Sequence, residues 1–238
     1  MNRPLFALIV GLALLAAACG SASDATEIEI TDSFDTGAIS IDSGNVVVLG
    51  NNDGTTTVEA TLSYSGTAPE VSAEVVDGGL VIGHTCAGSD ECSVDYDISL
   101  PESTALVVEV GEGKLTVSSM KAELSATTGS GEVFLNTIEG PAIMAHSGKG
   151  FVFGTQMKTT DASFTAVEGD IDVAFDEVIE SLLVTTDKGD ITVQLQGGPY
   201  AFDLATDGGV TNKVDASDTA PNTVVLRTGS GDIEVFPQ

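Results

Sequence analysis

Two cysteines and a histidine lie close enough in the sequence to do redox or metal chemistry. Cys86 and Cys92 are separated by Ala-Gly-Ser-Asp-Glu, and His84 lies two residues before the first cysteine. In an oxidising compartment we expect the two thiols to pair as a disulfide. Closing so short a loop contributes roughly 2 kcal/mol in the chain-entropy model. The alternative is a two-cysteine metal or redox site, but the C-x-x-C spacing is missing and His84 is the one nearby histidine.

Three aspartates recur at one position of a repeating pattern and could act as metal ligands or catalytic acids. Asp170, Asp190 and Asp232 each follow a glycine, so stacked repeats would place them along one edge. Aspartates and turn carbonyls can hold Ca²⁺. However, Ca²⁺-binding β-rolls have a nine-residue period and a G-G-x-G-x-D pattern, which this chain does not follow. We therefore predict no metal or other cofactor, and expect these aspartates to cap turns and keep edges soluble. A weak Ca²⁺ site is the alternative.

The other polar residues do not suggest a catalytic group. Nucleophilic catalysis needs a base beside the nucleophile. His146 directly precedes Ser147 in a glycine-rich turn, where a solvated histidine is expected. Polysaccharide-cleaving β-helices need clustered acids with a basic partner, and Arg227 is the single arginine beyond Arg3. The absence of tryptophan also leaves few platforms for stacking on sugars. We predict that the protein is not an enzyme.

The N-terminus predicts export and a lipid anchor. Arg3 precedes an apolar stretch from Leu5 to Leu15, which is typical of a signal peptide and short for a membrane span. Leu15-Ala-Ala-Ala-Cys19 resembles a bacterial lipobox, with its leucine one place earlier than usual. We expect residues 1–18 to be cleaved, Cys19 to carry a diacylglyceryl group, and residues 19–27 to comprise that cysteine and a short flexible tether. An ordinary A-x-A cleavage site followed by a chance cysteine is the alternative.

Composition limits the partners of the remaining domain, residues 28–238. The chain has 238 residues, 36 acidic and 8 basic, for a formal net charge of −28. Such a charge opposes binding to nucleic acid, which requires clustered lysine and arginine, and opposes electrostatic binding to anionic lipid. Because 42% of residues are hydrophobic, the chain is too apolar for a disordered acidic tail. Membrane contact is therefore expected through the lipid on Cys19.

A repeat of roughly nineteen residues fills the second half of the chain. Its anchors are glycines spaced 18 to 22 residues apart, at Gly113, Gly131, Gly150, Gly169, Gly189, Gly209 and Gly231. Two residues after each anchor lies an aliphatic column of Leu115, Val133, Val152, Ile171, Ile191 and Ile233, with Thr211 in the degenerate sixth repeat. Further aliphatic columns lie four residues after and five and seven residues before each anchor. Similar columns surround Gly44 and Gly78.

The columns predict an all-β fold. Each repeat holds two strands with period-two alternation, one on each side of a glycine turn. In a β-solenoid each repeat is one coil and the aliphatic columns stack into a core. In an antiparallel β-sandwich each turn would be a hairpin. The constant repeat length and constant inward columns favour the solenoid, and the sandwich is the alternative.

The repeats resemble a known family. TGSGEVFL, TTDKGDITV and RTGSGDIEVF are similar to the Gly-Ser-Gly-Asp-Ile signature of the bacterial putative-adhesin β-strand-repeat domains, a group of unknown function. VVDGGLVIG and the strand ending at Leu100-Pro101 resemble the centre of that family. The resemblance covers most of the chain after the signal peptide. It implies a β-helix-like surface or envelope protein and brings no catalytic residues.

Three functional hypotheses follow. The first is a non-enzymatic, lipid-anchored envelope protein that presents a surface for adhesion or for an envelope partner. The second is an envelope stress or signalling accessory protein with the same fold. The third, a carbohydrate-active enzyme, would require acids and Arg227 to converge in a groove. The ligand or surface partner is not specified by any motif.

Overall fold

The structure is a computed structural model that describes residues 9–11, 22–87 and 89–238. Those residues form strands and turns, with no helix among them. Within these ranges there is accordingly no helix long and apolar enough to cross a membrane. Cys19 and most of the predicted signal peptide lie outside the described residues, so lipidation stays a prediction.

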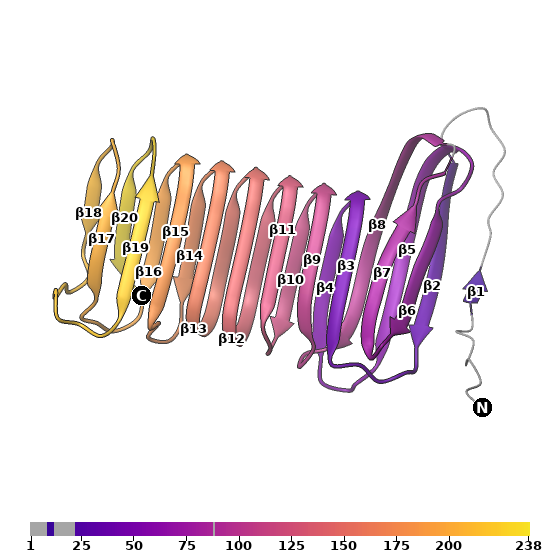
Figure 1. Ribbon diagram of the computed structural model, residues 1–238, viewed down its shortest axis with the longest axis horizontal. Coiled ribbons are helices and arrows are strands. Elements are labelled where there is room, and N and C mark those ends of the chain that lie inside the picture. Colours follow the sequence, from indigo (N-terminus) through magenta and orange to yellow (C-terminus); the bar gives the residue numbers. More distant parts are fainter. Residues whose placement is uncertain (1–8, 12–21, 88) are drawn as a thin grey trace.

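The fold is a β-solenoid whose coils each contribute one strand to each of two faces (Figure 1). The first face contains β3 (Thr36–Ser43), β9 (Ala105–Glu112), β11 (Leu124–Ser130), β15 (Ser181–Lys188), β17 (Ala201–Ala205) and β19 (Thr223–Thr228). The second face contains β4 (Val46–Asn51), β10 (Leu115–Met120), β14 (Ile171–Phe175), β16 (Ile191–Leu195), β18 (Val210–Asn212) and β20 (Ile233–Pro237). The long strands β12 (Val133–Lys149) and β13 (Val152–Glu168) each run from the second face to the first. Strands that stack within each face of these coils are parallel.

The aliphatic columns of the sequence form the core between the two faces. Leu115, Val133, Val152, Ile171, Ile191 and Ile233 are all at most 1% exposed. They pair in register along the second face, as Val133 does with Val152 and Ile171 does with Ile191. Identical positions therefore stack on one another, as expected for a solenoid and not for a sandwich, where successive hairpins have different environments.

The coils do not stack in sequence order at the C-terminus. Strands β19 and β20 lie between the β15–β16 coil and the β17–β18 coil, so the last repeat in the sequence is the penultimate coil. Val224 and Ile233 of the inserted coil are fully buried, whereas Val210 of β18 is 50% exposed. The degenerate sixth repeat is the end of the stack, where a coil packs on one neighbour and needs fewer apolar residues.

The predicted register of that sixth repeat is wrong by one residue. Val210, and not Thr211, pairs with Ile233, although Leu204 pairs with Leu226 as expected. The corner between Leu204 and Val210 is one residue shorter than in the other coils. Gly208 therefore takes the place assigned to Gly209.

An N-terminal cap covers the other end of the stack (Figure 1). It consists of β1 (Ile9–Gly11), β2 (Ala22–Ile30), β5 (Thr56–Gly66), β6 (Glu70–Val76), β7 (Gly79–Thr85) and β8 (Ser89–Pro101). Here β1, β2, β5 and β8 pair antiparallel, and β6 and β7 form a hairpin. Gly78 is thus in a hairpin turn and is not a coil corner.

The predicted tether is shorter than expected. Residues 22–27 belong to β2, which pairs with β5 from Ala22 opposite Tyr64 to Ile30 opposite Thr56. The Tyr64 hydroxyl donates a hydrogen bond to Asp24. Long-range strand pairing orders a segment whose composition alone suggested a linker.

The anchor glycines form a ladder of close backbone contacts along one corner of the solenoid. An ideal Cβ on any of Gly113, Gly131, Gly150, Gly169, Gly189 and Gly231 would lie 1.9 to 2.2 Å from the carbonyl oxygen of the glycine in the neighbouring coil. Their φ angles, +134° to +155°, are also rarely adopted by residues with a side chain. Glycine is required at this corner for both reasons.

Candidate functional site

The aspartate column is used to hold neighbouring coils together. The N–H of Asp190 donates to Asp170 Oδ1 at 2.8 Å, and the N–H of Asp232 donates to Asp190 Oδ1 at 2.7 Å. The N–H of Gly209 in turn donates to Asp232 Oδ1 at 2.7 Å. Each carboxylate accepts a backbone hydrogen bond from the next coil, as the turn-capping interpretation expects.

A column of hydroxyl groups was missed in the sequence. Thr128, Ser147, Thr186 and Thr228 are buried and donate to the carbonyl oxygen of the anchor glycine in the preceding coil, at 2.8 to 3.2 Å. The signal was available, because each lies three residues before its own anchor glycine. These bonds satisfy carbonyl groups that the corner would otherwise bury.

The candidate catalytic residues do not converge. His146 lies on the outer side of the first face, and its Nδ1 is 2.7 Å from the Thr165 hydroxyl. Arg227 pairs with Asp203 of the terminal coil. Among the described residues these partners differ from those of Asp170, Asp190 and Asp232, which accept backbone hydrogen bonds, so Arg227 is not paired with the aspartate column.

Three phenylalanines on the outer side of the second face were also missed. Phe134 packs against Phe151 and Phe153, and the Lys114 ammonium lies 3.9 Å from the Phe134 ring centroid. Phe151 and Phe153 border a shallow recess of about 330 Å³ that Asp172 also lines. Burial raises the pKa of the Asp172 carboxyl. These residues come from consecutive coils, so stacking brings them together although they are distant in sequence.

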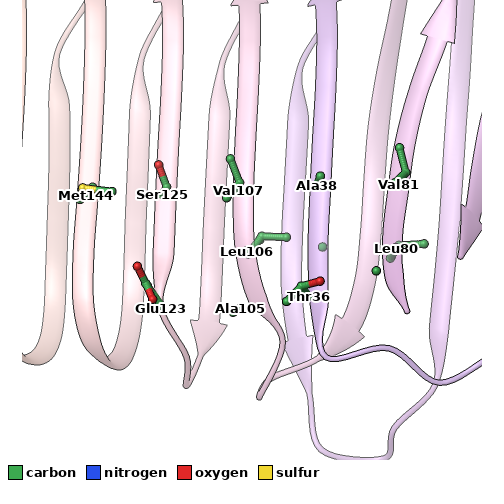
Figure 2. Close-up of a pocket in the computed structure, with 12 residues that line it drawn as sticks. Thr36, Ala38, Leu80, Val81, Ala105, Leu106, Val107, Glu123, Ser125 and Met144 are labelled. Atoms are coloured by element: carbon green, nitrogen blue, oxygen red, sulfur yellow. The ribbon is translucent and has the colours of Figure 1, made fainter. Parts of the chain in front are cut away.

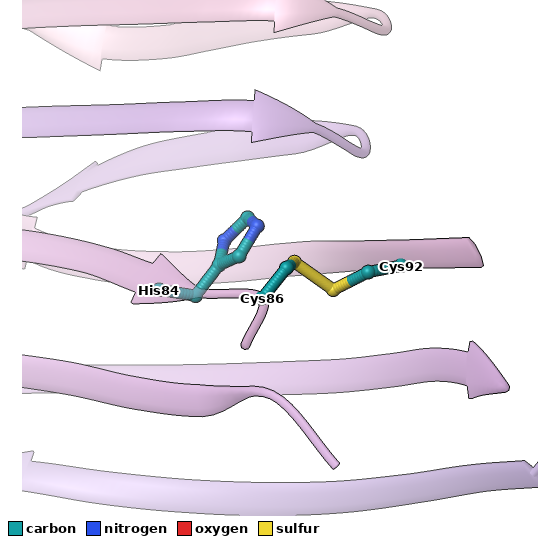
Figure 3. Close-up of side chains that lie close together, drawn as sticks. All are labelled: His84, Cys86 and Cys92. Carbon is teal, nitrogen blue, oxygen red and sulfur yellow. A yellow bond between two sulfur atoms is a disulfide. The ribbon is translucent and has the colours of Figure 1, made fainter. Parts of the chain in front are cut away.

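Cys86 and Cys92 form a disulfide beside His84 (Figure 3). His84 lies near the end of β7, Cys86 follows that strand, and Cys92 is in β8, with 6.1 Å between the two cysteine Cα atoms. The disulfide therefore ties the segment that follows β7 to β8 within the cap. One potential ligand atom from each of the three side chains lies within 4.8 Å of the others.

The His84 ring is held against the core. Its Nδ1 is 3.3 Å from the hydroxyl of Tyr96, a residue that is 1% exposed. Its Nε2 is buried and has no hydrogen-bonding partner among the described residues. Burial lowers the pKa of the His84 imidazole and raises the pKa of the Tyr96 phenol.

An apolar recess of about 550 Å³ lies on the outer side of the first face, next to the cap (Figure 2). Its lining comes from β7, β3, β9, β11 and β12 and includes Val81, Ala38, Val107, Ser125 and Met144. These side chains form one row, because Ala38 pairs with Val81 and Val107, and Ser125 pairs with Val107 and Met144. Val81, Val107 and Met144 are 43 to 48% exposed. Glu123 adds a carboxylate to the rim.

The fold defines the chain as an all-β solenoid protein. Its described features are recesses on the outer faces and columns of residues that hydrogen-bond from coil to coil. The family model for the Toastrack domain, DUF4097, matches residues 27–236. The chain belongs to this family, which confirms the resemblance to the adhesin-like domains of unknown function.

Solved structures share the fold at low sequence identity. One is a putative adhesin from Bacteroides fragilis NCTC 9343, with a TM-score of 0.56 and 14% identity over 92% of this chain and 98% of the other. Another is a putative adhesin from Parabacteroides merdae ATCC 43184, with a TM-score of 0.50 and 14% identity over 90% and 95% of the two chains. No curated protein matches the sequence significantly.

Proposed function

We propose that the protein is a non-enzymatic, lipid-anchored protein of the bacterial cell envelope that binds a protein partner in the apolar recess. The observation that carries this proposal is that Val81, Val107 and Met144 lie half-exposed in a hollow, in one row with Ala38 and Ser125. Recessed apolar surface of this kind is typical of interaction sites. The names of the structural relatives, putative adhesins, agree with a surface-binding role.

The charge of the chain selects the chemistry of that partner. With 36 acidic and 8 basic residues, the protein repels acidic proteins and attracts basic ones. Glu123 at the rim supplies a local acceptor. The occupant is therefore an apolar protein segment flanked by lysine or arginine.

A lipid on Cys19 would hold the cap towards the membrane. Cys19 lies three residues before Ala22, the first residue of β2, and β2 is at the capped end of the stack. The recess is then close to the membrane and the β17–β18 coil is the distal end. This arrangement favours a partner within the envelope or at its surface.

Membrane fractionation tests the anchor, and protease treatment of intact cells tests the location. In the fractionation we expect the wild-type protein to remain with the membranes and Cys19→Ala to be released. Cleavage from outside would support surface recognition. Protection until the envelope is opened would instead favour the envelope-accessory hypothesis, and membrane retention of Cys19→Ala would contradict the anchor.

Site-specific crosslinking in intact cells tests the recess. A photo-crosslinking residue at position 107 should give one discrete adduct, and Met144→Lys should reduce it. The same probe at position 183 is the matched control, since Leu183 is 39% exposed on the same face but outside the recess. Mass spectrometry should place the adduct on an apolar segment with flanking basic residues. Equal adducts at both positions, or none, would contradict the proposal.

A further inference from the structure

We propose that His84, Cys86 and Cys92 form a redox-gated binding site for a thiolate-preferring transition metal ion such as Zn²⁺. In the oxidised protein the disulfide closes the site. In the reduced protein the two thiolates and the imidazole become three ligands. This inference stands independently of the recess and of its partner.

The first support is the placement of the ligand atoms. A sulfur from each cysteine and a ring nitrogen of His84 lie within 4.8 Å of one another. Zinc binds thiolate sulfur at about 2.3 Å and imidazole nitrogen at about 2.0 Å in tetrahedral geometry. This implies separations of roughly 3.5 to 4 Å between ligand atoms. Once the disulfide is broken, rotation about the side-chain bonds of Cys86 and Cys92 can separate the sulfurs while β7 and β8 stay in place.

The second support is the unsatisfied nitrogen of His84. Its Nε2 is buried without a hydrogen-bonding partner among the described residues, which is unusual because buried polar atoms are almost always paired. A metal ion bound at Nε2 would satisfy this atom. The Tyr96 hydroxyl, 3.3 Å from Nδ1, would then orient the ring from the other side, as partners of metal-bound histidines do.

The third support is the donor set. Two thiolates and one imidazole are the protein ligands of known zinc sites that keep a fourth position open. The same soft donors disfavour Ca²⁺ and Mg²⁺, which prefer oxygen. His84, Cys86 and Cys92 are each partly exposed, so the site lies near the surface, with Nε2 of His84 covered while the disulfide is closed.

The chemistry balances with a thiol reductant. Two thiol molecules reduce the Cys86–Cys92 bond, form one disulfide between themselves, and leave two cysteine thiols on the protein. Binding of Zn²⁺ then releases the two thiol protons, and water takes the fourth position. Exchange with an external disulfide would reverse the step: the Cys86–Cys92 bond forms again, the external disulfide is reduced to two thiols, and Zn²⁺ is released.

The test uses the chain carrying Cys19→Ala, so that no third thiol contributes. Co²⁺ is titrated into oxidised protein and into protein reduced with a phosphine, and Zn²⁺ is then added in competition. We expect one Co²⁺ per reduced chain, with thiolate-to-metal charge transfer and a four-coordinate spectrum, and displacement by Zn²⁺. The oxidised chain should show none of these signals.

Two variants locate the ligands. His84→Gln should weaken Co²⁺ binding by at least about tenfold and alter its spectrum. His146→Gln is the matched control, since it removes the other histidine far along the stack, and should change nothing. Circular dichroism must show that the reduced chain keeps its β-structure.

Each contrary result would overturn the proposal. These results are loss of β-structure on reduction, failure of the reduced chain to bind Co²⁺, equal binding by the oxidised chain, or unchanged binding by His84→Gln. None of them bears on crosslinking at position 107, so the proposed function is judged separately.

Discussion

The stacked coils and the N-terminal cap use similar alternating strands but hold them together by different means. In the coils the strands are parallel, and the glycine corners and the hydroxyl column repeat from one coil to the next. In the cap the strands are mainly antiparallel, and a disulfide ties the segment after β7 to β8. Repeated contacts therefore suffice to hold the coils together, because each coil packs on a similar coil. The end of the stack lacks a further copy and needs pairings of its own.

The largest effect should come from placing a charge in the core of the coils. Ile191→Asp buries a carboxylate at a fully buried position, and we expect it to cost at least about 4 kcal/mol and to prevent stable folding. Leu183→Asp in the same coil is the control, because Leu183 is 39% exposed, and should cost less than about 1 kcal/mol. Urea denaturation measures both. Equal denaturation midpoints for the two variants would show that Ile191 does not point into the core.

Gly150→Ala should break the glycine ladder. Its new Cβ would lie 2.2 Å from the Gly131 carbonyl oxygen at a φ of +134°, so coils must separate, and we expect a loss of about 3 kcal/mol. Gly54, in the turn between β4 and β5, also has positive φ, +76°, but a Cβ added there has no atoms within 4 Å. Gly54→Ala should cost about 1 kcal/mol. If thermal unfolding shows similar losses for both, close packing is not the reason for glycine at the corner.

Removal of the disulfide should affect the cap and spare the coils. Cys86→Ser with Cys92→Ser should lower the free energy of unfolding by roughly 2 kcal/mol, because the unfolded chain regains the freedom of the short loop. Hydrogen exchange should rise in β7 and β8 and stay unchanged in β12 and β13. Faster exchange throughout the coils would mean that the cap and the stack unfold as one unit.

The smallest effect should come from the hydroxyl column. Thr186→Val keeps the side-chain shape but leaves the Gly169 carbonyl oxygen without the bond it accepts at 3.0 Å. We expect a loss of about 1 kcal/mol. Thr185→Val, at the adjacent outward position, is the control and should be neutral within about 0.5 kcal/mol. If Thr186→Val left the free energy of unfolding unchanged, the hydroxyl column would contribute through packing alone and not through hydrogen bonds.

Much of the regular stack could be predicted from residue types and their spacing. The period near nineteen, the inward columns through Ile171 and Ile191, and the glycine corners follow from local alternation that repeats in register. The hydroxyl column could also have been predicted, because a serine or threonine lies three residues before Gly131, Gly150, Gly189 and Gly231. The resemblance to the family rested on the same repeats.

Features that depend on contacts between distant segments could not be predicted. The insertion of β19 and β20 before the terminal coil is one, because the sequence records chain order and not stacking order. The strand formed by residues 22–27 is another, since its partner β5 lies more than 25 residues away. The phenylalanines around Phe134 and the recess beside Val107 arise where successive coils place outward side chains in one row.

The sequence by itself determined that this chain folds as a β-solenoid with an apolar core, because each repeat contains its own strands and turns. Only the tertiary structure decided the order of the coils, the form of the cap, and which outward residues share a surface. Those features depend on which segments bury one another at the two ends of the stack. That choice is set by burial over the whole molecule and not by any local pattern.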